Sequence, residues 1–321
     1  MLPAPYDRWF AEICGRPGPV EARSTCESCA MLAGAPDLPP QGPFDAATRC
    51  CTYHPSLAPH FVGAILREGG HGAGVVRQRI AARAGVTPLG LAPPQEWTAA
   101  WRRLAADGFG RSRELLCPFH ADARCSIWRH RGAACAAFHC KYDRGATGAS
   151  LWGLLLIAYN TIERALAGWL LGRHGLDAAA CDAFLHAPAD AALDARAWGG
   201  WQGREEEYFC AAAEAIAPLS WAEVAAIGGS GLARLAEALR DAVKRFDLAQ
   251  PPARVRHNAD ILVHLGRSGS VRLQNPRAPL DLLEVPAGLA NRLEGLQDAP
   301  ADELGLDPSL LRRLLDWEVL I

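Results

Sequence analysis

The chain has 321 residues, half of them hydrophobic and 21% charged, so it can bury a large core and does not belong to the disordered class. Its formal net charge is −2, which is too weak to indicate a nucleic acid or a membrane surface as partner.

No targeting signal is apparent at the start of the chain. The first ten residues, MLPAPYDRWF, lack the charged-then-apolar pattern of a signal peptide. The most apolar run, Leu151 to Ile162, is too short to span a bilayer. We therefore expect a soluble cytoplasmic protein, in which the 11 cysteines are metal ligands rather than disulfides.

The first third of the chain alternates short helices with irregular segments. Proline and glycine make residues 15–44 irregular. Helices are predicted at 6–14, 57–67, 75–84 and 95–106.

The run from Glu68 to Gly74, EGGHGAG, resembles an acidic–glycine loop that binds S-adenosylmethionine or a dinucleotide. Such a loop needs a strand before it and a helix after it. The preceding FVGAILRE has the pattern of a helix, so a glycine-rich turn between two helices is the favoured interpretation.

The middle of the chain is almost entirely helical. Apolar residues recur round most of a predicted helix at 150–174, which is typical of a buried helix. Further helices are predicted at 177–187, 204–216, 219–227 and 231–246.

The pattern changes after Pro251-Pro252. Paired strands are predicted at 260–266 and 270–274, followed by helical segments at 287–296, 301–304 and 308–315, the last capped by Asp307. We predict a mainly α protein: a cysteine-rich helical metal-binding domain at 1–250, with its ligand region at 20–142, and a small α+β, winged-helix-like domain at 251–321.

Thiols gather in the first half of the chain. Cys117 to Cys140 holds four cysteines in twenty-four residues, and upstream lie a Cys-x-x-Cys pair and a Cys-Cys doublet. Two intervening residues let both sulfurs of a pair reach one metal. The predicted metal ligands are Cys26, Cys29, Cys50, Cys51, Cys117, Cys125, Cys135 and Cys140.

The donor set leaves the metal open. Long, irregular spacings favour an iron–sulfur cluster of the [4Fe-4S] kind, whereas zinc usually takes four ligands at short paired spacings. His54, His120 and His139 are alternative zinc ligands or hydrogen-bonding neighbours. Chance placement of the eight thiols is the third interpretation, and the three other cysteines are expected in the core: Cys14, Cys181 and Cys210.

The downstream cysteines carry a family resemblance. The stretch CPFHADARCSIWRHRGAAC resembles the YkgJ-type CxxCxxCC family of zinc- or iron-chelating proteins, whose pattern is Cys-Pro-Phe-Leu, a spacer, then Cys-x-Ile-Tyr-x-x-Arg-Pro-x-x-Cys. The matching positions are Cys117, Pro118, Phe119, Cys125, Ile127, Trp128, Arg131 and Cys135. The family's upstream cysteines match Cys26, Cys29 and the Cys50-Cys51 doublet, so the resemblance covers about residues 20–142.

The chain also departs from this family's pattern. The doublet lies twenty residues after Cys29 rather than two, Gly132 replaces the usual proline, and Ala136 the usual arginine. The resemblance implies chelation of iron or zinc. A looser resemblance, to the flagellin lysine-N-methylase, implies a cluster-bearing protein that acts on another protein.

Three functions follow as hypotheses. The first is a protein with an iron–sulfur cluster in redox or protein-modification chemistry. The second is a zinc-stabilised interaction module whose C-terminal domain recruits a protein or peptide, since 8 Arg against 10 Asp and Glu in 251–321 argue against nucleic acid. The third is an S-adenosylmethionine-dependent protein methyltransferase.

Overall fold

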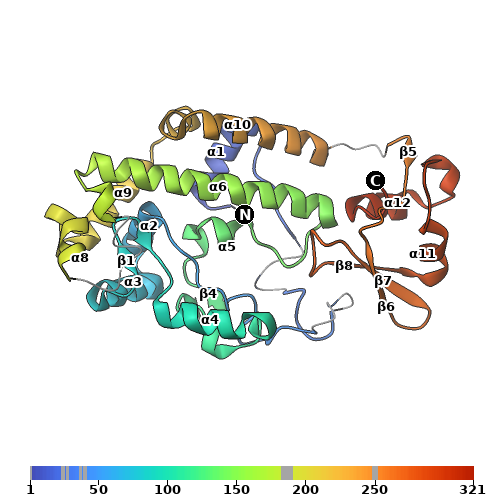
Figure 1. Ribbon diagram of the computed structural model, residues 1–321, viewed down its shortest axis with the longest axis horizontal. Coiled ribbons are helices and arrows are strands. Elements are labelled where there is room, and N and C mark those ends of the chain that lie inside the picture. The colour runs from blue at the N-terminus through green and yellow to red at the C-terminus, as the bar shows by residue number, and fades with distance from the viewer. Residues whose placement is uncertain are drawn as a thin grey trace. The chain divides into compact units, whose positions relative to one another are not determined.

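The computed structural model describes residues 2–22, 26, 29–35, 38, 42–181, 191–247 and 252–321, without the side chains of 191–194 (Figure 1). About 54% of the chain is helical and its sheets are small and antiparallel, which confirms a mainly α protein with a small α+β part. The chain forms two compact units. The first unit comprises Met1–Pro19, Cys50–Phe138 and Leu155–Leu239, and the second comprises Val20–Arg49, His139–Leu154 and Arg240–Ile321. The domain boundary predicted near residue 250 thus falls inside the last segment of the second unit.

The helices of the first unit follow the predicted ones closely. They are α1 (Ala4–Cys14), α2 (Pro59–Glu68), α3 (Gly70–Ala82), α4 (Gln95–Gly108), α5 (Ala133–Ala137), α8 (Ala191–Trp198) and α9 (Glu205–Ile216), with most of α6 (Gly145–Arg173) and part of α10 (Trp221–Asp247). Three short 3-10 helices, η1 (Arg113–Leu115), η2 (Trp128–His130) and η3 (Gly199–Trp201), and two hairpins, β1–β2 (Val86–Thr87, Gly90–Leu91) and β3–β4 (His120–Ala121, Arg124–Cys125), complete the unit. The α5 and α8 helices are additions to the prediction, and most of the predicted helix at 177–187 lies outside the described residues.

The predicted pair of helices at 219–227 and 231–246 is present as the two parts of α10. They meet at a break at Gly229, where φ is 63° and ψ is −155°. That left-handed conformation suits glycine, which explains why the break falls within a Gly-Gly-Ser-Gly run.

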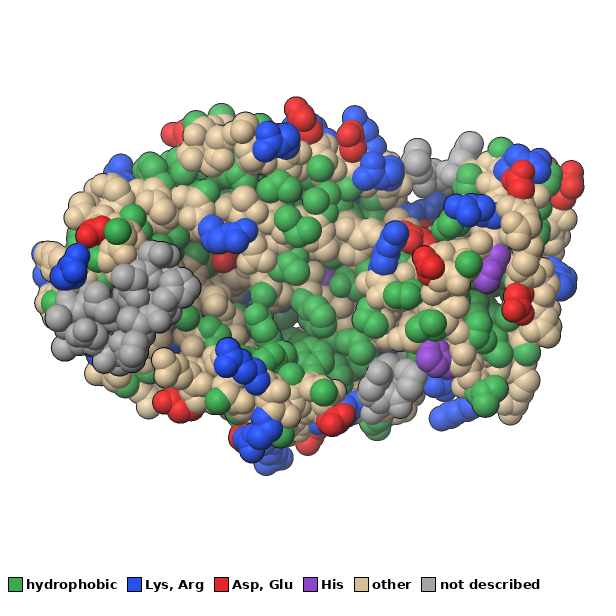
Figure 2. Space-filling view, viewed as in Figure 1, with side chains coloured by type: hydrophobic (Ala, Val, Ile, Leu, Met, Phe, Trp, Pro, Cys, Tyr) green, Lys and Arg blue, Asp and Glu red, His purple; other side chains and the backbone are tan. Residues whose placement is uncertain are grey.

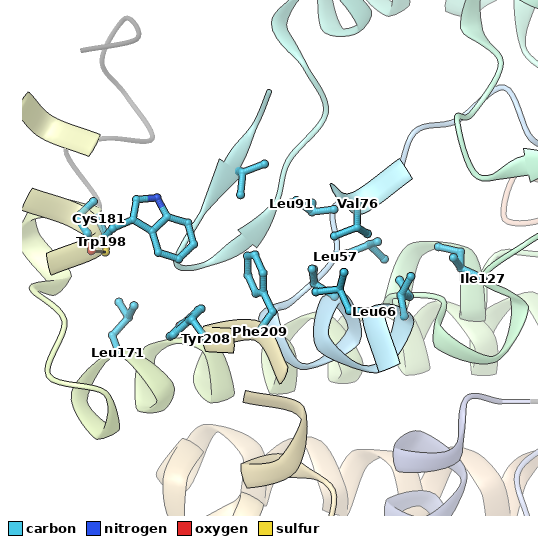
Figure 3. Close-up of a cluster of buried hydrophobic side chains, with 14 of the residues drawn as sticks. Leu57, Leu66, Val76, Leu91, Ile127, Leu171, Cys181, Trp198, Tyr208 and Phe209 are labelled. Atoms are coloured by element: carbon cyan, nitrogen blue, oxygen red, sulfur yellow. Dashed lines mark hydrogen bonds between the residues drawn. The ribbon is translucent and has the colours of Figure 1, made fainter. Parts of the chain in front are cut away.

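The core of the first unit forms where α2 packs against α9. Its side chains lie in one continuous row from Trp198 through Phe209 to Ile127 (Figure 3). Trp198 is fully buried and meets the rings of Tyr208 and Phe209 edge-to-face at centroid distances of 5.6 and 5.8 Å. Backbone approach is close as well, because a Cβ built on Gly63 of α2 would lie 1.8 Å from the carbonyl oxygen of Phe209.

The α6 helix is longer than its most apolar run predicts. Among the described residues, it is the one single helix long and apolar enough to cross a membrane, and 44% of its most apolar window is buried within the protein. The bent pair α9 and α10, at 99°, passes the same test only when taken as one span. Core helices also pass this test, so the cytoplasmic location stays a prediction.

A half-buried carboxyl on α6 links three helices of the first unit. Glu163 accepts hydrogen bonds from the hydroxyl of Tyr6 on α1 and from the backbone N–H of Ala133 in α5, the latter at 2.7 Å. Tyr6 in turn stacks on Tyr159 at a centroid distance of 4.0 Å. Burial raises the pKa of Glu163 to about 7 in spite of these two donors.

The raised pKa gives a pH-dependent contribution to stability. Below pH 4.5 the Glu163 carboxyl is protonated in both states. As the pH rises from 4.5 to 7, Glu163 ionises in the unfolded chain before it ionises in the folded protein. Its contribution to the free energy of unfolding therefore falls by roughly 3 kcal/mol. When the pH is raised from 4.5 to 8, we expect the stability of Glu163→Gln relative to wild type to increase by this amount. Urea unfolding of both proteins at both pH values measures it. A constant difference between the two proteins would contradict the prediction.

The second unit contains the predicted α+β part. A three-stranded antiparallel sheet has the order β6 (Leu262–Leu265), β7 (Ser270–Gln274), β8 (Leu282–Pro286), and β5 (Arg254–Val255) pairs with β9 (Ala299–Pro300). The helices are α11 (Ala287–Leu293) and α12 (Pro308–Asp316), with a 3-10 turn η4 (Asp302–Leu304). Asp307 caps α12 as predicted, since its Oδ1 accepts from the N–H of Ser309 at 2.9 Å. The predicted hairpin is confirmed, while β8, β5 and β9 were not predicted.

Candidate metal centre

Five of the eight predicted ligands lie in the first unit and come from four separate pieces of chain. Cys50 and Cys51 occupy a turn before α2, and Cys117 follows η1. Cys125 ends β4, and Cys135 lies in α5. The backbone joins two of these pieces directly, because the N–H of Cys117 donates to the carbonyl oxygen of Cys51 at 2.7 Å.

A tight hairpin brings Cys125 back beside Cys117. Asp122 and Ala123 turn the chain with φ of 49° and 58°, the conformation of a two-residue hairpin whose twist matches its strands. Ser126 then donates to the carbonyl oxygen of Phe119 through both its N–H and its hydroxyl, each at 2.8 Å. This local chemistry explains why seven residues between two cysteines suit one site.

The thiols are close enough to influence one another. Burial, together with the nearby thiols of Cys125 and Cys50, raises the pKa of Cys117 to about 12. Burial also raises the pKa of Cys135, with added contributions from Cys117, Cys125 and Cys50. The pKa of Cys51 is also raised, mainly by its hydrogen bond with Cys50 and next by burial. Without a metal these thiols therefore keep their protons at neutral pH.

Two arginines oppose this effect. Arg79 lowers the pKa of Cys117, and Arg131 lowers those of Cys125 and Cys135. Both guanidinium groups belong to residues that are only 6% exposed, so their positive charges act on the thiols through a water-poor interior. Arg131 is one of the positions that carry the family resemblance, whereas no pattern in the sequence points to Arg79.

Hydrogen bonds fix both guanidinium groups. Arg79 donates from Nε and Nη2 to the carbonyl oxygen of Ala84, at 2.9 and 2.6 Å, and its Nη1 lies 3.3 Å from His54 Nε2. Arg131 donates from Nη1 to the carbonyl oxygen of Cys135 at 3.2 Å and lies 3.4 Å above the ring of Trp128. The cations are therefore built into the fold rather than left in solvent.

Aromatic side chains of the first unit lie beside the thiols. Tyr53 is near Cys135, since that thiol helps burial to raise the pKa of Tyr53. The ring of Tyr53 meets Trp101 edge-to-face at 5.5 Å, and Trp101 stacks on Trp97 at 5.1 Å. The three rings therefore form an aromatic cluster that reaches Cys135 through Tyr53.

The other three predicted ligands belong to the second unit. The carbonyl oxygen of Cys26 accepts a hydrogen bond from Arg49, and that of Cys29 accepts from the N–H of Leu32 at 3.3 Å. Cys140 is 8% exposed and contributes to the raised pKa of Tyr142. The full set of eight ligands stays a prediction.

Thiols are suitable ligands for a soft metal, but the thiols of the first unit do not converge on one common point. Across the part of the chain that is described, no group of three or more His, Cys, Asp or Glu side chains is arranged to hold a metal ion. Thiolates are nevertheless the donors that zinc and iron–sulfur clusters prefer. Metal binding would therefore have to draw the thiols together.

Of the three cysteines expected in the core, Cys181 and Cys210 match that prediction, whereas Cys14 is only half-buried at the end of α1. Cys181 is fully buried in the core, with its Sγ 3.6 Å from the carbonyl oxygen of Ala197, and Cys210 packs against the same core. Substitution of Cys181 or Cys210 is therefore a control for substitution of the five proposed ligands.

The glycine-rich loop has the predicted structure of a turn between helices. Gly69 and Gly70 have φ of 83° and 69°, with α2 before them and α3 after them. The strand that a nucleotide-binding loop needs before its glycines is therefore missing from this position, which carries a helix. The hypothesis of S-adenosylmethionine binding then depends on the looser family resemblance alone.

Comparison with known proteins adds no further information, because no family model, curated protein or solved structure matches this chain.

Proposed function

We propose that the first unit holds a metal centre on cysteine thiolates, with an iron–sulfur cluster of the [4Fe-4S] kind favoured and zinc as the alternative. The observation that supports it is the gathering of five thiols from four pieces of chain, in which Cys50, Cys117 and Cys125 raise the pKa values of neighbouring thiols. The proposed ligands in this unit are Cys50, Cys51, Cys117, Cys125 and Cys135.

The surrounding residues suit such a centre. Arg79 and Arg131 would offset the negative charge of several thiolates, and Tyr53 would lie beside the bound centre at Cys135. A cluster held there supplies one-electron redox chemistry, either for electron transfer or for modification of another protein.

Metal analysis of protein purified without oxygen tests the proposal. We expect iron and sulfide in the full chain, with absorbance near 400 nm. A colourless protein with one zinc per chain would replace the cluster by the zinc alternative. Protein that takes up neither metal would contradict the metal centre itself.

A separate observation favours a protein-binding role for the second unit. We propose that this unit, which we regard as winged-helix-like, recruits a protein partner through the β6 strand at the sheet edge. Three apolar side chains of β6 are exposed, Leu262 at 51%, Val263 at 61% and Leu265 at 92%. An apolar edge strand is a template for an added strand from another chain. Basic and acidic side chains are interspersed over the face shown in Figure 2, which gives no sign of a nucleic-acid surface there.

A charge placed on β6 tests this role. Leu265→Asp in the full chain should lose a partner that wild type retains in affinity capture. Ile157→Asp, which changes an exposed apolar residue of α6, is the control and should retain it. Equal capture by all three proteins would contradict recruitment through β6.

A further inference from the structure

A groove in the second unit lies beside the β6 strand. Its volume is about 630 Å³, and it is bounded by the β6–β7 hairpin, by α11 with the residues that follow it, and by residues 256–261. The larger apolar side chains of its lining are Ile261, Val263, Val271, Leu273, Leu293 and Leu296. The groove therefore offers an apolar surface next to the exposed edge of the sheet.

β6 carries a projecting side chain on the same face as this groove. The register pairs Val263 with Leu273 and Leu265 with Val271, and side chains that are paired or two positions apart share one face of a sheet. Val263 belongs to the lining, whereas Leu265 does not and is 92% exposed. One face of the hairpin thus has an apolar groove at Val263 and an uncovered leucine two residues further along.

The backbone of β6 is open to another strand at these same two residues. The N–H of Gly266 donates to the carbonyl oxygen of Ser270 at 3.1 Å, and hydrogen-bonded pairs alternate along antiparallel strands. His264 therefore pairs with β7, while the N–H and C=O groups of Val263 and Leu265 point away from it. β6 is the terminal strand of the described sheet, so these groups lie at a free edge.

Charged side chains lie at both ends of β6. Asp260 and Glu294 are exposed residues of the groove lining near the start of the strand, and Arg267 is exposed just after its end. None of these three forms an ion pair with another described residue. The lining also includes Arg256 and His257, so its mouth is mixed in charge, with the acids beside the start of β6. An acidic start and a basic end make the strand complementary to itself in an antiparallel pair.

We propose that the protein partner recruited by β6 is a second copy of this chain, bound through a twofold-symmetric pairing of the two β6 strands. The strands run antiparallel about His264, so that Val263 of each copy lies opposite Leu265 of the other. This register uses the open backbone groups and keeps the apolar faces of both hairpins on one side. The inference rests on the proposed recruitment through β6 and identifies the partner.

The pairing gives each exposed feature of β6 a partner. Leu265 of one copy lies over the groove at Val263 of the other, and Arg267 of one copy lies beside Asp260 and Glu294 of the other. Each contact occurs twice, as a twofold interface requires. The pairing also covers an apolar edge strand, which proteins otherwise protect with charges or bulges.

Sedimentation velocity of the full chain in reducing buffer tests the proposal. The chain has a mass of 34.4 kDa, and we expect the observed mass to approach twice this value between about 1 and 100 μM, because an interface of hairpin size gives weak association. Leu265→Asp should weaken the dimer at least tenfold, since it places a carboxylate against apolar walls. Ile157→Asp, which changes an exposed apolar residue of α6, should dimerise like wild type.

A charge reversal tests the arrangement of the two strands. Arg267→Glu brings a third carboxylate beside Asp260 and Glu294 and should weaken the dimer about fivefold. Asp260→Arg in the same chain should restore it. Circular dichroism and thermal unfolding check that each variant is folded.

Three results would overturn the dimer: a wild type that stays monomeric at 100 μM, a dimer that persists in Leu265→Asp, or no recovery in the double variant. A monomeric wild type that still captures a different protein, and loses it in Leu265→Asp, would show that β6 recruits a partner other than a second copy. The failure of this inference is therefore distinguished from failure of the recruitment itself.

Discussion

Replacement of Cys117 by alanine is expected to abolish metal binding by the first unit. Cys117 lies between the other thiols: its backbone N–H donates to Cys51, and its pKa responds to Cys125 and Cys50. Loss of a central ligand leaves the remaining thiols without a shared point of coordination. Iron, sulfide and zinc per chain, measured after anaerobic loading, should fall from about one centre to near zero.

The same variant should lose the stabilisation that metal provides. A ligand at about 1,000 times its dissociation constant stabilises the folded state by about 4 kcal/mol, which should appear as a higher unfolding midpoint for metal-loaded wild type. Cys117→Ala should unfold at the same midpoint with and without metal. The release of protons on loading is a further readout, because the thiols are protonated before metal binds.

Cys181→Ala is the matched control for this experiment. Cys181 is at least as deeply buried as Cys117 and belongs to the same hydrophobic core, but its pKa is raised by burial and Asp177 and not by another thiol. We expect a small loss of stability from the missing sulfur and an unchanged metal content. If Cys117→Ala keeps the metal content of wild type, or if Cys181→Ala loses metal equally, the proposal of a metal centre on these thiols is wrong.

Features that depend on residues close together in the sequence could be predicted, whereas features that depend on distant contacts could not. Helical periodicity and capping are local, so the long helix after Cys140, the break near Gly229 and the Asp307 cap could all be predicted. The β8 strand was missed because its residues 282–286, LLEVP, bury most of their side chains and do not alternate.

The candidate site shows the same limit. The residue type and density of the cysteines indicated thiolate chemistry, but spacing alone did not separate the thiols of the first unit from those of the second. Arg79 acts on Cys117 only because α3 brings it there, thirty-eight positions earlier in the chain. His60 appears in the sequence as one polar residue in the helix PHFVGAILRE, and only the folded chain shows that both its ring nitrogens are buried without a partner among the described residues.

The close approach of Gly63 in α2 to the backbone of Phe209 in α9 predicts a second large effect, on stability. Gly63→Ala should destabilise the protein by about 3 kcal/mol or more, because the added Cβ would lie 1.8 Å from the carbonyl oxygen of Phe209 and 2.9 Å from the Cβ of Ala213. A flexible side chain could move aside, but a backbone carbonyl in the middle of α9 cannot move without the helix. Relief therefore requires α2 and α9 to separate and opens the core that holds Trp198.

Gly168→Ala is the control that isolates this effect. Gly168 lies within α6, and a Cβ built on it meets nothing within 4 Å. The same substitution should there stabilise the protein by about 0.5–1 kcal/mol, because alanine favours the helix over glycine. Urea unfolding of the two variants should thus give shifts of opposite sign from one chemical change. Similar shifts in both variants would show that α2 and α9 are not in contact through Gly63, and the core of the first unit would need another arrangement.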